Sequence, residues 1–207
     1  MATTDRHPHP GRHADSILFD TKAGLLRARR SLTNALDRQV RRHPILPAAA
    51  GATIAEVVTT LYTDIDPNER ALQLGKVQNL RIGARTLDGA VLDADAVFSF
   101  WAQVGRPTRA RGFVEGRELR QGCIIATIAG GLCQLSNSLY RVAQQAGCEI
   151  VERHGHTAPI SGSAFPPGED ATVFWNYVDL RFRVPQKVVL RARLSQSDLI
   201  VRLEAAR

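Results

Sequence analysis

One stretch near the middle of the chain limits what the rest can fold into, because it combines a tight turn, a cysteine and a helical pattern. Gly130 and Gly131 lead directly to Cys133. Apolar residues then recur at positions 135, 139, 142 and 143, which is the spacing of one helical face. Gly147 follows at a point where a glycine commonly ends a helix. The pattern predicts a helix that begins at or near Cys133, directly after a flexible turn.

The expected position of Cys133 has chemical consequences. In the first turn of a helix, backbone N–H groups and the positive end of the helix dipole converge. That setting favours the thiolate, which is the nucleophilic form of cysteine. The preceding glycines would let a backbone segment or a ligand approach closely. The sequence therefore predicts a functional site around Cys133, and it names no substrate.

The other patterns predict an α+β fold with N-terminal helices, a central helix that starts at Cys133, and a mainly antiparallel C-terminal sheet. Residues 16–42 and 67–87 have helical patterns, whereas several segments that are β-branched or alternate in polarity are typical of strands. These segments are residues 53–63, 148–153, 171–177, 180–184, 188–194 and 199–203. We expect a disordered tail over residues 1–15, a helical extension over 16–66 and one folded domain over 67–207.

The net charge of the chain limits the kinds of partner that we expect. The chain has 27 lysines and arginines against 20 acidic residues, a net charge of +7. Without a recognisable nucleic-acid-binding module, we expect no specific nucleic-acid partner. The basic helix over 16–42 has two interpretations: a solvated face on a packed helix, or a weak contact with an anionic membrane.

The three cysteines have irregular spacing, which predicts reduced thiols rather than a disulfide framework. The sequence contains neither a signal peptide nor a run of about 18 apolar residues that would make a transmembrane segment. We therefore expect a cytoplasmic protein without a cofactor.

Two histidines and two aspartates follow the cysteine and suggest one catalytic hypothesis. In a thiol-dependent acyl hydrolase or transferase, Cys133 would attack an acyl carbon and His154 or His156 would take its proton. Asp170 or Asp179 would then orient the imidazole ring. The order of these residues permits such an arrangement but is not specific to it.

Two other hypotheses use the same region. His154 and His156 would share one face of a strand, and with Cys133 they would make a zinc site that keeps an open position. In the hypothesis that we favour, the region is a polar cleft that binds a peptide or glycan-type ligand. The residues predicted to line this cleft are Gly130, Gly131, Gln134, Ser136, Asn137, Arg153, Trp101, Asn79 and Arg81.

Several sequence blocks, in a fixed order, resemble a known family. The blocks are residues 75–81, 97–101, 104–105, 130–136, 139–140, 150–156, 170–175 and 179–180. From about Gly75 to Val184, the chain resembles the VanW family, which is named for an accessory protein of vancomycin-resistance clusters. The chain departs from the family pattern in two places: Ala129 replaces a frequent third glycine, and Gly155-His156-Thr157 stands where the family usually has another residue followed by His-Ser. The resemblance implies a link to cell-wall metabolism or vancomycin resistance, but no reaction, because the family's biochemical activity is unestablished.

Overall fold

The computed structural model describes residues 12–47, 51–62, 67–120, 123–155 and 170–206, with side chains from residue 24 onward in these ranges except at positions 68, 119, 120, 123 and 124. Its helices are α1 (Arg12–Leu36), α2 (Arg70–Leu87), α3 (Phe100–Val104) and α4 (Leu132–Gln145), with short 3-10 helices η1 (Pro67–Glu69) and η2 (Arg109–Arg111). Its strands are β1 (Thr53–Thr60), β2 (Ala90–Leu92), β3 (Val97–Ser99), β4 (Glu115–Arg120), β5 (Cys123–Ile128), β6 (Glu149–Glu152), β7 (Arg181–Arg183), β8 (Val188–Leu194) and β9 (Asp198–Ala205). This content confirms the predicted α+β class.

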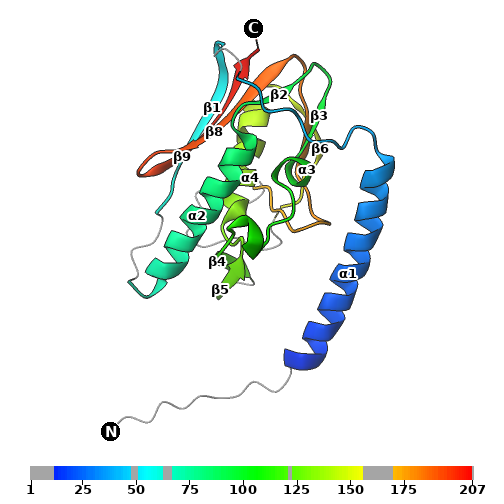
Figure 1. Ribbon diagram of the computed structural model, residues 1–207, viewed down its shortest axis with the longest axis vertical. Coiled ribbons are helices and arrows are strands. Elements are labelled where there is room, and N and C mark those ends of the chain that lie inside the picture. Colours follow the sequence, from blue (N-terminus) through cyan, green and yellow to red (C-terminus); the bar gives the residue numbers. More distant parts are fainter. Residues whose placement is uncertain (1–11, 48–50, 63–66, 121–122, 156–169, 207) are drawn as a thin grey trace.

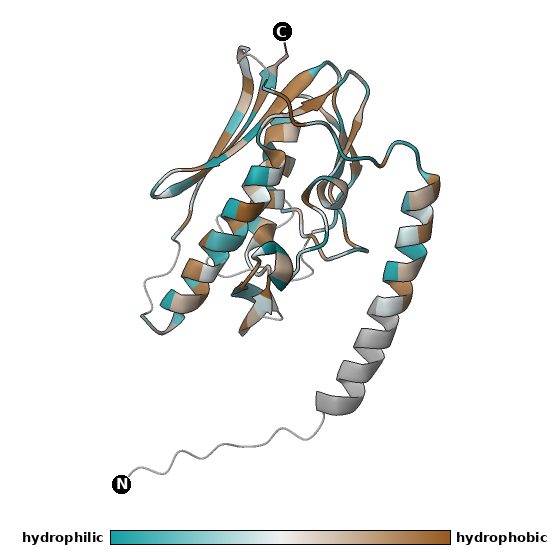
Figure 2. Cartoon of the chain, in the orientation of Figure 1, coloured by the Kyte–Doolittle hydropathy of each residue, from teal (hydrophilic) through white to brown (hydrophobic). Residues whose placement is uncertain are grey.

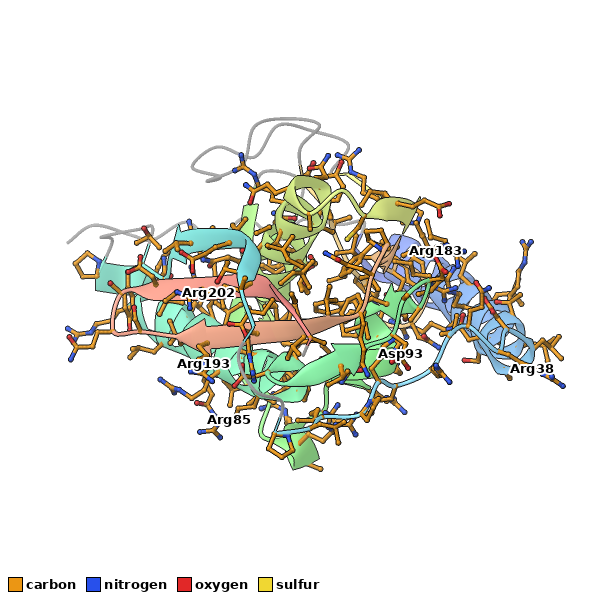
Figure 3. All side chains as sticks on the ribbon, turned by 90° about the horizontal axis from the view of Figure 1, so that it is seen from above. Arg38, Arg85, Asp93, Arg183, Arg193 and Arg202 are labelled. Carbon is orange, nitrogen blue, oxygen red and sulfur yellow. The ribbon has the colours of Figure 1, made fainter. Side chains whose placement is uncertain are left out.

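The largest sheet is antiparallel and has the strand order β1-β9-β8-β2. Alternate residues of its strands, such as Val57, Val201 and Leu203, are buried, as expected for a sheet with one face on the core. Helices α2 and α4 pack on this face, and Figure 1 shows them side by side beneath the sheet. The opposite face carries charged residues such as Arg193 and Arg202, which Figure 3 labels along the sheet.

Two smaller sheets complete the domain. Strands β3, β7 and β6 form the second sheet, in that order, and β4 and β5 form an antiparallel hairpin. Phe98 and Phe182 face each other in the second sheet, with ring centroids 4.8 Å apart. Both rings are fully buried, so this sheet joins the same hydrophobic core as the first.

Helix α4 agrees closely with its prediction. It begins at Leu132, which makes Cys133 its second residue, and it ends where Gly147 takes a left-handed conformation with φ 70°. The Gly147 N–H donates to the Gln144 carbonyl and the Cys148 N–H donates to the Ala143 carbonyl. These bonds satisfy carbonyl groups that a helix end otherwise leaves unpaired.

Other element boundaries differ from the prediction. Helix α1 ends at Leu36 rather than at residue 42, because the Asp37 side chain accepts a hydrogen bond from the Gln39 N–H and competes with the helical pattern. In the predicted strand over residues 171–177, only an isolated bridge between Phe174 and Val178 forms. The strands predicted over residues 188–194 and 199–203 are confirmed as β8 and β9, which pair as an antiparallel hairpin. At its turn the Ser195 hydroxyl accepts hydrogen bonds from two backbone N–H groups.

Candidate functional site around Cys133

The turn before α4 requires both of its glycines. Gly131 precedes the helix with φ 98°, and a Cβ atom there would lie 2.1 Å from Cγ of Lys76. At Gly130 a Cβ atom would lie 2.2 Å from the Gly116 carbonyl oxygen. Since real Cβ contacts this short do not occur, the close approach predicted from the sequence is made by the β4 backbone and by a lysine side chain.

Cys133 lies between the core and the surface. Its side chain is partly buried and packs against the edge of the hydrophobic core. The sulfur lies 3.5 Å from Oγ1 of Thr172. The Cys133 N–H belongs to the first turn of α4, where N–H groups have no partner within the helix. The thiol therefore has a hydroxyl neighbour and a helix N-terminus beside it.

Helix α4 holds the segment that carries Thr172. The Asn137 Oδ1 atom accepts a hydrogen bond of 2.6 Å from the Ala171 N–H, and the Ser136 hydroxyl donates one of 2.5 Å to the Ala171 carbonyl. All three residues are buried. Ser136 and Asn137, both predicted to bind ligand, thus fix both polar groups of one residue and set the position of Thr172.

His154 meets the same segment through its backbone. Its carbonyl accepts a hydrogen bond of 2.7 Å from the Thr172 N–H. Its imidazole is half exposed and lies 3.2 Å from a carboxylate oxygen of Glu152. In the described part of the chain, no hydrogen bond joins this imidazole to Cys133. His156 lies outside the described residues.

The two candidate aspartates have different surroundings. Asp179 is buried, and its carboxylate accepts hydrogen bonds from the Ser99 hydroxyl, the Trp101 N–H and the Arg181 guanidinium. The Asp170 carboxylate lies 3.6 Å from a guanidinium nitrogen of Arg153. The same guanidinium donates to the Asp170 carbonyl and lies over the Tyr140 ring. Asp179 therefore organises the protein interior, whereas Asp170 lies in the segment that leads to Thr172.

The remaining predicted residues hold the scaffold of the site. Asn79 is fully buried, and its amide bonds the Val114 backbone and the Gly130 carbonyl. The Gln134 amide donates to the Thr59 hydroxyl and the Thr60 carbonyl, which ties α4 to β1.

Two predicted residues lie away from the Cys133 thiol's own contacts. Trp101 is buried, packs edge-on against Trp175 and donates to the Val178 carbonyl. Arg81 is exposed, and its guanidinium donates to the Gln78 side chain one turn earlier on α2.

Histidine, cysteine and acidic side chains do not gather into a three-ligand metal site anywhere in the described residues. The zinc hypothesis needs His156, so it stays a prediction.

The part of the chain that contains these contacts matches a known family. Residues 75–204 match the VanW-like proteins. The chain belongs to this family. Its VanW-like region is 33% identical over 127 residues to the uncharacterised protein YoaR of Bacillus subtilis, and covers 60% of this chain and 41% of YoaR.

A second relative carries a functional name. The chain is 30% identical over 131 residues to the vancomycin B-type resistance protein VanW of Enterococcus faecalis, covering 62% of this chain and 48% of that protein. The chain thus spans less than half the length of both relatives. No solved structure matches it.

Sequence reasoning missed two residues of the VanW-like region. Thr172, the neighbour of the thiol, is uncharged and gave no signal beyond its place in a family block. Lys76 is buried and lies across Gly131. Burial, reinforced by the positive charge of Arg117, lowers the pKa of the Lys76 ammonium to about 8. The sequence did contain a signal for this burial, because Lys76 lies four residues before the apolar Leu80 and so shares its face of the helix.

Proposed function

We propose that this VanW-like protein binds a peptide or glycan-type ligand at the start of α4, beside the Cys133 thiol. One observation carries the proposal: three separate segments meet at Thr172. Its hydroxyl lies 3.5 Å from the Cys133 sulfur, and its N–H donates to the His154 carbonyl. The thiol, the hydroxyl and the half-exposed imidazole are the polar groups available to a ligand there.

The supporting residues give this surface its rigidity. Ser136 and Asn137 are used to hold Ala171, and Asn79 and Gln134 are used to hold the turn and the helix. A binding site held by such interior bonds loses little conformational freedom when a ligand binds. These side chains therefore position the ligand-binding groups instead of contacting the ligand.

Family membership supports the choice of a peptide or glycan-type ligand. One relative is named as a vancomycin B-type resistance protein, and we extend to this chain a role in cell-wall metabolism or vancomycin-type resistance. The matching probe is a soluble muramyl pentapeptide, because it joins a sugar and a peptide in one molecule.

Calorimetric titration with the muramyl pentapeptide tests the proposal. Thr172→Val keeps the shape and removes the hydroxyl, so we expect binding to weaken about tenfold, the value of one hydrogen bond. The matched control is Thr33→Val, at an exposed threonine of α1. Absence of binding by the wild-type chain, or equal affinities for the two variants, would refute the proposal.

The position of Cys133 as the second residue of α4 favours one alternative, a thiol-dependent acyl hydrolase or transferase. The thiolate would bond to the acyl carbon, the bond to the leaving amine would break, and His154 or His156 would deliver the proton to that amine. Asp170 suits the orienting role better than Asp179, because Asp170 lies in the segment that leads to Thr172, whereas the Asp179 carboxylate accepts hydrogen bonds from Ser99 and Arg181 in the protein interior.

Intact-mass spectrometry after incubation with the same probe separates binding from catalysis. An acyl-enzyme would add the mass of the acyl fragment to the wild-type chain and to Cys148→Ser, but not to Cys133→Ala. Binding without any adduct or product supports the ligand-binding function alone.

A further inference from the structure

The described part of helix α1 contacts the rest of the protein through polar side chains. The Arg27 guanidinium donates to the Trp175 carbonyl at 2.9 Å and lies over the Phe174 ring. One turn later, Arg30 pairs with Glu152 and lies 3.6 Å from Asp179. Residues 27, 30 and 34 follow the spacing of one helical face, so the face toward the protein is the basic one.

The opposite face of α1 is apolar and exposed. Leu25, Leu32 and Leu36 have 76%, 66% and 76% of their surface exposed. With 3.6 residues per turn, positions 25, 32 and 36 share a face on the far side from Arg27 and Arg30. Figure 2 shows hydrophobic residues interrupting the hydrophilic ones along this part of the helix. We call these three residues the leucine ridge.

Positive charge accompanies the leucine ridge. Arg29 lies between Leu25 and Leu32 on this face and is exposed, and the exposed Arg38 follows the last turn. Figure 3 places Arg38 at the edge of the molecule, beside the end of α1. Residues 22–36 include no aspartate or glutamate, and the next acid, Asp37, lies 3.7 Å from Arg181. In the described part of the chain, Arg29 and Arg38 form no ion pair.

We propose that α1 lies along the surface of an anionic phospholipid bilayer, with the leucine ridge among the acyl chains and Arg29 and Arg38 at the phosphates. An exposed apolar ridge next to unpaired arginines has the charge and hydrophobicity of an interfacial helix. A second copy of the ridge would bring Arg29 and no carboxylate to neutralise it, whereas anionic lipids supply the complementary charge.

The dimensions fit a helix that lies on the bilayer without crossing it. From Leu25 to Leu36 the ridge rises about 16 Å, roughly half of a bilayer's hydrocarbon thickness. In the described segments, no helix combines the length and the apolar character needed to span a membrane. The protein would bind by way of the face of α1 that points away from the Cys133 site, so this inference does not depend on the proposed function.

Co-sedimentation of the full chain with vesicles tests the inference. We expect binding to vesicles of phosphatidylcholine and phosphatidylglycerol at a 3:1 ratio, and binding at least about tenfold weaker to pure phosphatidylcholine. The double variant Leu32→Ser/Leu36→Ser should lose about tenfold or more in affinity, and Arg29→Gln about fivefold. The matched control is Leu74→Ser, because Leu74 is an exposed leucine of α2.

Three outcomes would overturn the inference: no binding of the wild-type chain, equal binding to both vesicle types, or equal loss in the double variant and Leu74→Ser. Light scattering provides a second readout. A wild-type dimer that the double variant converts to a monomer would assign the leucine ridge to contact between two copies and would also overturn it. Circular dichroism should give the same spectrum for every variant.

Discussion

Lys76 gives the sharpest prediction for stability. The residue is 6% exposed, and in the described part of the chain its ammonium has no hydrogen-bond or ion-pair partner. Burial lowers the pKa of its ammonium from the usual 10.5 to about 8. That gap corresponds to a penalty of about 3 kcal/mol for keeping the charged form in the folded protein at neutral pH. Lys76→Met keeps the stem that crosses Gly131 and removes the charge, so it should stabilise the fold by up to about 3 kcal/mol at pH 7.

The sign of the pH dependence follows from the same values. Between pH about 8 and 10.5 the unfolded chain binds more protons at this lysine than the folded chain, so wild-type stability rises with pH. Urea titrations from pH 7 to 10.5 should therefore show the advantage of Lys76→Met shrinking towards zero at the upper end. Lys187→Met, at a half-exposed lysine, should change stability by less than about 0.5 kcal/mol. A destabilised Lys76→Met would show that the lysine is charged and paired in the folded state. An advantage that does not vary with pH would show that folding leaves the pKa of the lysine unchanged, which would refute the reasoning.

Three further predictions concern other buried groups. Burial lowers the pKa of His43 below 6.5, so the unfolded chain takes up the proton first and stability should fall as the pH drops from 7.5 to 5.5. The urea midpoint of His43→Gln should depend less on pH over this range than that of the wild type, and an equal dependence would contradict this. Burial raises the pKa of the Cys148 thiol to about 11, so peptide mass mapping at pH 8 should find iodoacetamide on Cys133 well before Cys148, and the reverse order would be inconsistent with the burial. Asn79→Ala removes three hydrogen bonds and should cost about 3 kcal/mol in urea unfolding, whereas a change below about 1 kcal/mol would mean that water replaces the amide.

The parts of the fold that were predicted are those in which local signals agree. Helix α4 has glycines in left-handed conformations on both sides, at Gly131 and Gly147, and an apolar face between them. The β8–β9 hairpin has alternating strands and a turn whose hydroxyl binds the backbone. In both cases, the residues that form the element also end it, so neighbours in sequence were enough.

Contacts between distant segments were the part that sequence could not predict. Periodicity identified the leucines and arginines of α1, but it gives only which residues share a face; Arg30 contacts the protein because Glu152, 122 residues later, lies beside it. The contact between Thr172 and the Cys133 thiol was not predicted, because the residues expected beside a reactive thiol are ionisable ones. A threonine 39 residues away in the sequence gives no indication of such a contact. The predicted roles of His156 and of the zinc alternative stay predictions, since His156 lies outside the described residues.

The close backbone contacts of the turn before Cys133 restrict which substitutions this protein can accept during evolution. Cβ atoms added at Gly116 and Gly130 would lie 2.5 Å and 2.2 Å from each other's carbonyl oxygens, and one at Gly75 would lie 1.9 Å from the Glu115 carbonyl. A side chain added at any one of these positions would clash with backbone atoms, which cannot move aside as a flexible side chain does. A backbone shift that relieved one of these clashes would leave the other two in place. Single mutational steps away from glycine are therefore blocked at all three positions, and the geometry around the thiol is preserved by steric exclusion even when no ligand selects for it.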